Sequence, residues 1–123
     1  MNVNRLIDTT GLQSAIEDFA RPRNWDQFHS PKNLAMALTG EVGELVEIFQ
    51  WLTEAQSREA MADPARAVHI HEELADVTIY LVRLASVLGV DLDAAVRDKL
   101  AKNAQKYPPP SVSFTYPQRE GNT

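Results

Sequence analysis

Apolar residues recur with a helical period in four segments of the chain, and no segment shows the alternation of a strand with any weight. In the first segment, Leu12, Ile16 and Phe19 recur at spacings of four and three residues, which predicts one apolar helix face. The four predicted helices run from Thr9 or Thr10 to about Pro22, from Ser30 to about Gln56, from about Ala65 to Leu88, and from Asp91 to about Lys106. The expected fold class is therefore all-α.

These helices predict one all-α domain over residues 1–108, followed by an extended or disordered tail over 109–123. The tail begins in a run of three prolines and continues with polar residues. Residues 1–8 carry no helical pattern, and we expect them to fray.

Two of the predicted helices carry carboxylates beside their apolar faces. Glu41, Glu44 and Glu47 share one flank of the second helix, and Glu73 and Asp76 share one flank of the third, because successive residues turn by about 100°. If the two flanks pack together, up to five carboxylates meet, and their mutual repulsion raises their pKa values unless a cation neutralises them. A hard divalent ion with oxygen ligands, above all Mg²⁺, fits such a site.

Gly40 and Gly43 interrupt the second helix on or beside its acidic flank. Each glycine costs a helix interior about 1 kcal/mol relative to alanine. We therefore expect that something approaches the backbone closely at this flank, either a ligand or a tightly packed helix.

Composition excludes several classes of protein. The net charge of −5 argues against broad binding to the phosphate backbone of a nucleic acid. The absence of cysteine excludes disulfides and thiolate metal sites and is compatible with a reducing cytoplasm, which is the expected location. No signal-peptide pattern opens the chain, and the apolar run 77–90 is interrupted by Arg83 and too short to span a bilayer, so no membrane partner is expected.

The acidic helices also differ from other helical metal proteins. Di-iron bundles use Glu-x-x-His pairs, and none of the three histidines stands three residues after a glutamate. His69 and His71 are two residues apart and cannot face one zinc ion from a regular helix. A non-enzymatic helical adaptor, whose acidic flank meets a basic partner, remains the alternative from another class.

Glu41-x-x-Glu44 followed by Glu73-x-x-Asp76 resembles the signature of the MazG-like, all-α nucleoside triphosphate pyrophosphatases. Four stretches resemble the dCTP pyrophosphatase branch of that family and together cover most of residues 12–108. They are NWDQFHSPKN at 24–33, GEVGELVEIFQW at 40–51, EELADVTIYLV at 72–82 and KxxxNxxKYP at 99–108. At Ile16 this chain departs from members of the branch that carry a histidine on the first helix.

The resemblance implies a four-helix MazG-like bundle core that assembles as a homotetramer or homodimer. It also implies a Mg²⁺-dependent enzyme that cleaves a nucleoside triphosphate, with dCTP or a modified dCTP as the leading substrate, to the monophosphate and pyrophosphate. No nucleic acid polymer is implied as a partner. A pyrophosphatase that removes a different non-standard nucleotide is the alternative within the family.

The resemblance and the residue chemistry together assign the site. Glu41, Glu44, Glu73 and Asp76 would hold Mg²⁺, and Glu44 or Glu47 would orient or deprotonate the attacking water. The residues expected to bind the phosphates lie on the fourth helix and just after it: Lys99, Asn103, Lys106 and Tyr107. The aromatic and polar residues expected to enclose the base are Trp25, Phe28, His29, Asn33, Trp51 and Tyr80.

Overall fold

The computed structural model describes residues 4–110, and within this range every regular element is a helix, which confirms the all-α prediction. The α-helices are α1 (Thr10–Ala20), α2 (Pro31–Phe49), α3 (Glu54–Arg58), α4 (Pro64–Leu88) and α5 (Leu92–Lys106). The short 3₁₀ helices are η1 (Arg21–Arg23), η2 (Trp25–Phe28) and η3 (Ala60–Ala62). Most of the tail predicted at 109–123 lies outside the described residues. None of the described helices is long and apolar enough to cross a membrane.

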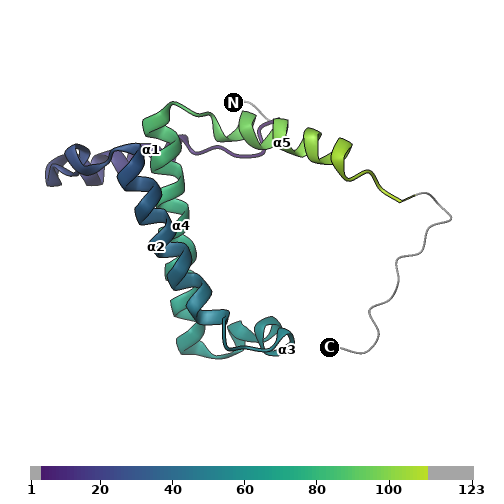
Figure 1. Ribbon diagram of the computed structural model, residues 1–123. Coiled ribbons are helices and arrows are strands. Elements are labelled where there is room, and N and C mark those ends of the chain that lie inside the picture. Colours follow the sequence, from purple (N-terminus) through teal and green to yellow (C-terminus); the bar gives the residue numbers. More distant parts are fainter. Residues whose placement is uncertain (1–3, 111–123) are drawn as a thin grey trace.

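Helices α2 and α4 lie side by side and antiparallel, and they form the frame of the molecule (Figure 1). The start of α2 is capped by Ser30, whose hydroxyl accepts a hydrogen bond from the Asn33 N–H at 3.2 Å. Asp63 caps α4 in the same way, and α4 ends at Gly89, which adopts the left-handed conformation with φ of 70°. Both boundaries of α4 agree with the sequence prediction.

The predicted extension of the second helix to about Gln56 is wrong. Helix α2 ends at Phe49, and Thr53 begins the separate short helix α3. The Thr53 hydroxyl accepts from the Gln56 N–H at 3.1 Å, while the Gln56 side chain accepts from the Thr53 N–H at 2.9 Å. This reciprocal pair forms a capping box, which requires extended backbone at Thr53 and so breaks the helix there.

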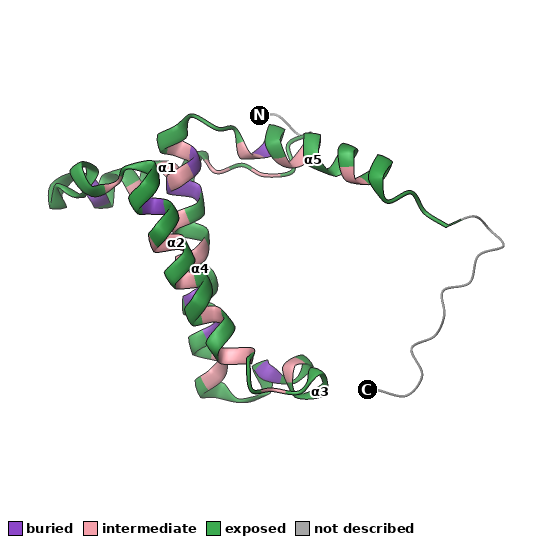
Figure 2. Cartoon of the chain, viewed as in Figure 1, coloured by how far each residue is buried: buried purple, intermediate pink, exposed green. Residues whose placement is uncertain are grey.

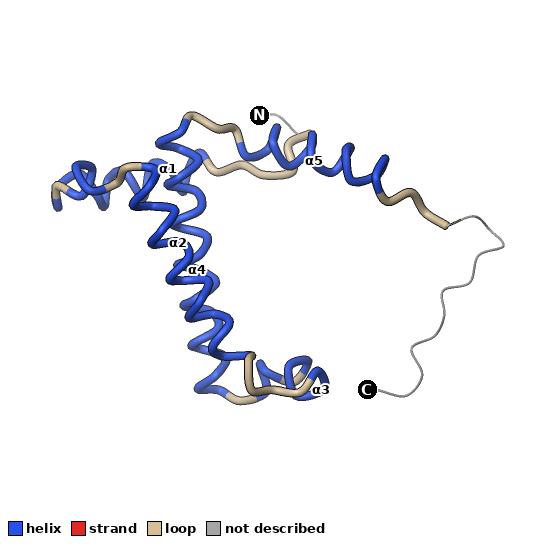
Figure 3. Tube along the Cα trace, in the orientation of Figure 1, coloured by secondary structure: helices blue, strands red, loops and turns tan. Residues whose placement is uncertain are grey.

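Helix α1 packs on α4 at one end of the α2–α4 pair, whereas α3 and η3 lie at the other end (Figures 1 and 3). Few side chains are fully buried, and exposed surface runs along both long helices (Figure 2). The predicted apolar face of α4 is only partly covered: Ile70 is buried, but Leu74, Leu81 and Leu88 are exposed. One chain therefore leaves an apolar strip of α4 in solvent.

Helix α5 leaves the end of α4 and extends away from the α2–α4 pair (Figure 1). Its first turn is tied to the N-terminal segment, because the backbone N–H groups of Leu6 and Ile7 donate to the Asp93 carboxylate at 2.6 and 3.0 Å. The prediction that residues 1–8 fray is thus wrong for this anchored part. The four-helix core expected from the sequence is not closed within a single chain, because α5 does not return to the pair.

Candidate active site

Three carboxylates meet where the middle of α2 crosses α4. Each of Glu41, Glu73 and Asp76 offers an oxygen that lies within 4.8 Å of the other two. Glu73 and Asp76 are one turn apart on α4, and the antiparallel packing brings Glu41 of α2 against them. The acidic flanks of α2 and α4 therefore face each other, as the sequence pattern predicts.

Burial and mutual repulsion raise the pKa values of two of these carboxylates, Glu41 and Glu73. Burial is the main cause that raises the pKa of Glu41 to about 7, assisted by a hydrogen bond with Glu73 and by the charges of Glu44, Asp76 and Glu73. Burial likewise raises the pKa of Glu73. Glu73 is only 6% exposed. Its Oε1 atom lies 3.5 Å from Nε2 of His69.

One oxygen of each of the two glutamates has nothing to bind. Glu41 Oε2 and Glu73 Oε2 are buried and find no hydrogen-bond donor among the described residues. A buried acceptor without a partner destabilises a fold, and a divalent cation with oxygen ligands would satisfy both atoms. The residues present therefore fit a divalent metal ion.

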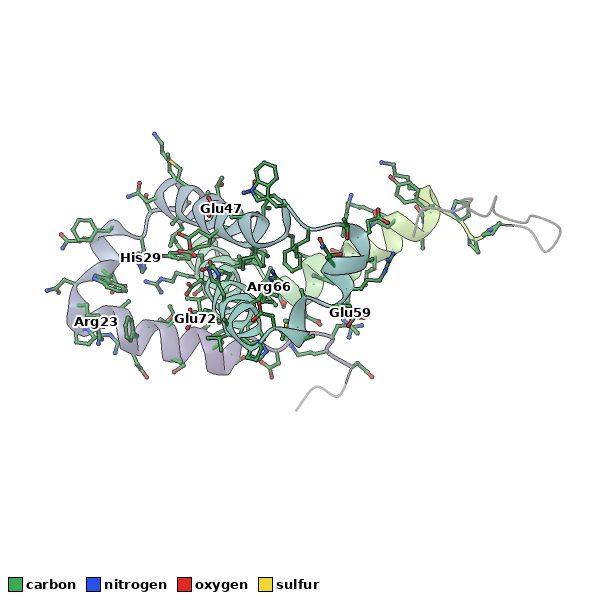
Figure 4. All side chains as sticks on the ribbon, turned by 90° about the horizontal axis from the view of Figure 1, so that it is seen from below. Arg23, His29, Glu47, Glu59, Arg66 and Glu72 are labelled. Carbon is green, nitrogen blue, oxygen red and sulfur yellow. The ribbon has the colours of Figure 1, made fainter. Side chains whose placement is uncertain are left out.

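The remaining two acids of the second helix lie further out. Glu44 borders the cluster closely enough to raise the pKa values of Glu41 and Glu73, yet its side chain is exposed. Glu47 lies one turn beyond on α2 (Figure 4) and is not part of the three-carboxylate cluster. The structure thus separates a partly buried inner group, in which Glu73 is the buried member, from two exposed acids that solvent water can reach.

An apolar cavity of about 480 Å³ adjoins the cluster, and Asp76 belongs to both. Helix α1 supplies most of the apolar wall, and the wall continues on the η2 turn and on α4. The lining residues are Leu12, Ala15, Ile16, Phe19, Ala20, Trp25, His29, Asp76, Ile79, Tyr80 and Arg83. A cavity of this size and polarity suits a planar ring.

The structure brings three of the six residues predicted to enclose a base to this cavity, namely Trp25, His29 and Tyr80. Phe19, which the sequence analysis did not assign to the site, meets the Trp25 ring edge-on with 5.3 Å between centroids. His29 lies at the side of the α2–α4 pair, near the short helix η1, which carries Arg23 (Figure 4).

The other three lie outside the cavity wall. The Asn33 amide donates to the Phe28 carbonyl at 3.0 Å, and the Phe28 ring itself is exposed. Trp51 is 86% exposed just beyond α2, at the opposite end of that helix from the cavity. In this structure these three residues do not line the cavity that contains Trp25.

The residues predicted to bind phosphates are also remote from the cluster within one chain. Helix α5 carries Lys99, Asn103 and Lys106 away from the α2–α4 pair, and Tyr107 follows its last turn (Figure 1). Lys99, Lys106 and Tyr107 are exposed to solvent. A site that uses them needs either a movement of α5 or a second copy of the chain.

Sequence reasoning missed two polar residues beside the cavity, Arg83 and Asp26. Arg83 is buried, and its guanidinium contacts both His29 and Asp26. A signal was present, since Asp76, Tyr80 and Arg83 follow one another at helical spacing on the flank of α4. This spacing places Arg83 on the same flank as Asp76 and Tyr80, but it does not by itself indicate which residues the guanidinium contacts.

The chain is similar to known proteins. The profile of the MazG-like family matches residues 37–112. The sequence is 50% identical over 91 residues to "dCTP pyrophosphatase 1" of Rattus norvegicus and 48% identical over 91 residues to that of Homo sapiens. Each match covers 74% of this chain and 54% of the relative, so the chain spans about half the length of the curated relatives it matches.

A solved structure is also similar. The crystal structure of a pyrophosphatase from Archaeoglobus fulgidus superposes with a TM-score of 0.75 at 39% sequence identity, covering 80% of this chain and 91% of that one. The profile match covers both acidic motifs, and the carboxylates of those motifs meet in the structure. On this evidence the chain belongs to the MazG-like family.

Proposed function

We propose that the chain is a Mg²⁺-dependent nucleoside triphosphate pyrophosphohydrolase that acts on dCTP or a modified dCTP. The observation that carries the proposal is that the partly buried carboxylate cluster adjoins an apolar cavity and shares one residue, Asp76, with it. A triphosphate held by a metal ion at this cluster would lie next to a pocket for its base. The choice of cytosine is supported by the similarity of the chain to relatives named dCTP pyrophosphatase 1.

In the proposed reaction, Glu41, Glu73 and Asp76 would hold the ion, and the exposed Glu44 would serve either as a further ligand or as the group that activates water. When bound, the ion supplies Lewis-acid chemistry to phosphate oxygens and water. A carboxylate that is not engaged by metal, Glu44 or Glu47, accepts a proton from the attacking water. The water oxygen bonds to the α-phosphorus, the bond to the bridging oxygen breaks, and pyrophosphate leaves.

The cavity beside the cluster would hold the base. Trp25 and Tyr80 provide aromatic surface, and the apolar side chains of α1, including Ile16, close the opposite wall. Stacking on such surfaces binds any base with little discrimination, so selection must come from hydrogen bonds at the base edge. His29 lies in the cavity wall and would supply such a hydrogen bond.

The phosphate side of the site would be completed by another copy of the chain, in a homotetramer or homodimer. Leu74, Leu81 and Leu88 leave an apolar strip on α4 exposed. At Gly40 and Gly43 a β-carbon would meet nothing within 4 Å, so packing inside one chain does not explain these glycines. In an assembly, α5 of one protomer would carry Lys99, Asn103 and Lys106 to the cluster of its partner, and Trp51 would approach a partner's cavity.

A pyrophosphate-release screen tests the proposal. The purified chain is incubated with Mg²⁺ and, separately, with dCTP, 5-substituted dCTP, dUTP, dTTP and the purine triphosphates. We expect the fastest release with dCTP or a 5-substituted form and none when the metal is chelated. Preference for a purine would reject the cytosine assignment, and release from no nucleotide would reject the enzyme in favour of an adaptor.

A further inference from the structure

Arg83 is a buried cation at the wall of the cavity, and the proposed reaction does not use it. Arg83 is 8% exposed, and its side chain reaches from α4 to the η2 turn. The Nε atom donates to His29 Nδ1 at 3.1 Å, and Nη2 donates to Asp26 Oδ1 at 2.6 Å. Two polar side chains of the turn are thus held by one guanidinium.

The contact with His29 determines where the imidazole carries its proton. A guanidinium has only donors, so the ring nitrogen that faces Arg83 must present a lone pair. The proton of the neutral ring then resides on the other nitrogen, Nε2. Burial and the Arg83 charge lower the pKa of His29, whereas Asp26 opposes them, and the neutral ring is favoured.

Asp26 gives Arg83 a countercharge. A cation beside an apolar wall is costly unless it is paired, and the short contact to Asp26 supplies that pair. The same ion pair alone would tie the turn to α4 without any consequence for a ligand. The Nε contact to His29 is the additional feature, because it leaves His29 with a single donor.

We propose that Arg83 is a positioning residue that holds His29 as a donor through Nε2 to an acceptor atom on the edge of a pyrimidine base. This inference rests on the proposed function, since both residues line the cavity assigned to the base. Cytosine offers two such acceptors, O2 and N3, on one edge. Arg83 itself does not touch the base, and it acts by keeping His29 Nδ1 free of a proton.

Two substitutions separate this effect from the ion pair. In Arg83→Gln, the side-chain nitrogen stands the same number of bonds from Cα as Arg Nε, so it can still donate to His29 Nδ1. Arg83→Met has a similar shape but no donor. Both variants lose the contact to Asp26 equally, and therefore the difference between them isolates the bond to His29.

The first measurement is the ¹⁵N spectrum of histidine-labelled protein without nucleotide at one neutral pH. The chain has three histidines, and loss of a signal in His29→Gln assigns the one of interest. We expect an unprotonated Nδ1 and a protonated Nε2 in the wild type and in Arg83→Gln. In Arg83→Met, Asp26 is left as the neighbour of the ring, so the Nδ1 signal should move toward the protonated position.

The second measurement is steady-state hydrolysis of dCTP. Losing a hydrogen bond that is equal in ground and transition states raises KM and leaves kcat within about twofold. We expect Arg83→Met to raise KM about three- to tenfold, the value of one hydrogen bond, and Arg83→Gln to restore it. Thermal melting of both variants checks that they fold alike.

Several results would overturn the proposal. They are a protonated Nδ1 in the wild type, an Arg83→Met variant with unchanged Nδ1 signal or unchanged KM, and an Arg83→Gln variant that behaves like Arg83→Met. If the wild type releases no pyrophosphate, it is the proposed function that fails. The ¹⁵N spectra still decide in that case whether Arg83 controls the proton on His29.

Discussion

At the scale of single residues, the carboxylates of Glu41, Glu73 and Asp76 lower the stability of the metal-free fold and provide ligands for a cation. Glu73 is buried beside Glu41 and Asp76, and one of its oxygens lacks a donor among the described residues. A negative charge at this buried position is costly unless a cation neutralises it. Amide substitutions at these positions remove the charge with little change of shape, so they separate the two effects.

We expect Glu73→Gln to raise the melting temperature of the metal-free chain and to abolish its stabilisation by Mg²⁺. The same change should reduce pyrophosphate release to below about a tenth of the wild-type rate, a loss of more than about 1.4 kcal/mol in transition-state stabilisation. Glu72→Gln is the matched control, because Glu72 is exposed and lies outside the cluster. A fully active Glu73→Gln would exclude Glu73 as a metal ligand.

The pKa of Glu41 predicts a dependence of stability on pH. Folding raises this pKa from 4.5 to about 7, so between these values the folded chain keeps a proton that the unfolded chain has lost. The stability that Glu41 contributes is therefore lost as the pH rises through this window. A metal ion must displace the same proton, and its affinity should increase with pH over the same range.

Thermal melting at about pH 5 and about pH 8, with and without Mg²⁺, measures both effects. The metal should raise the melting temperature more at the higher pH. Glu41→Gln carries no titrating group there, and the difference between its melting temperature and that of the wild type isolates the Glu41 contribution. If this difference is the same at both pH values, Glu41 does not titrate as proposed.

At the scale of elements, the junction after α2 depends on one hydroxyl. Thr53 accepts a hydrogen bond from the Gln56 N–H and so begins α3. Thr53→Ala should lower the free energy of unfolding by about 1 kcal/mol, whereas Thr53→Ser keeps the acceptor and should stay close to the wild type. Urea unfolding measures the difference, and equal midpoints for the two variants would show that the capping box contributes nothing.

The anchoring of α5 is a second property of an element. Two backbone N–H groups of the N-terminal segment donate to Asp93, and Arg97 Nε donates to its other oxygen at 3.0 Å. These donors hold the pKa of Asp93 below its usual range, with the bond from Ile7 as the largest cause. The contact therefore links the start of the chain to the first turn of α5.

At the scale of the whole molecule, the exposed apolar strip of α4 predicts self-association. Leaving Leu74, Leu81 and Leu88 in water costs about 25 cal/mol for each Å² of apolar surface. Light scattering should give a multiple of the 13.7 kDa chain mass, and Leu81→Lys should lower the mass that is observed. A monomer at micromolar concentration in the wild type would contradict the proposed assembly.

A complementation experiment tests whether α5 serves the site of a partner. Asp76→Asn disables the cluster of its own chain, and the double variant Lys99→Ala/Lys106→Ala disables α5. Each variant alone should be nearly inactive, whereas a mixture assembled from both should recover part of the wild-type rate, because some sites then combine an intact cluster with an intact α5. No recovery in confirmed mixed oligomers would place both parts of the site in one chain.

The sequence by itself determined the helices and the pairing of the acidic flanks. Helical periodicity and capping residues are local signals, and they located α4 from the Asp63 cap to Gly89. The proximity of Glu41, Glu73 and Asp76 could be predicted because each lies beside the apolar face by which its helix packs against the other. The resemblance of the same motifs to the MazG-like family was confirmed by the profile match.

Only the tertiary structure decided which of these residues share one site. Trp25 and Tyr80 meet at the cavity while Trp51 and Lys99 lie far from it, because contact between distant segments depends on the direction in which each helix leaves its turn. Arg83 reads as a defect in an apolar run, yet its guanidinium is satisfied by His29 and Asp26, more than fifty residues earlier. Periodicity describes one helix at a time, and such long-range pairing leaves no trace in it.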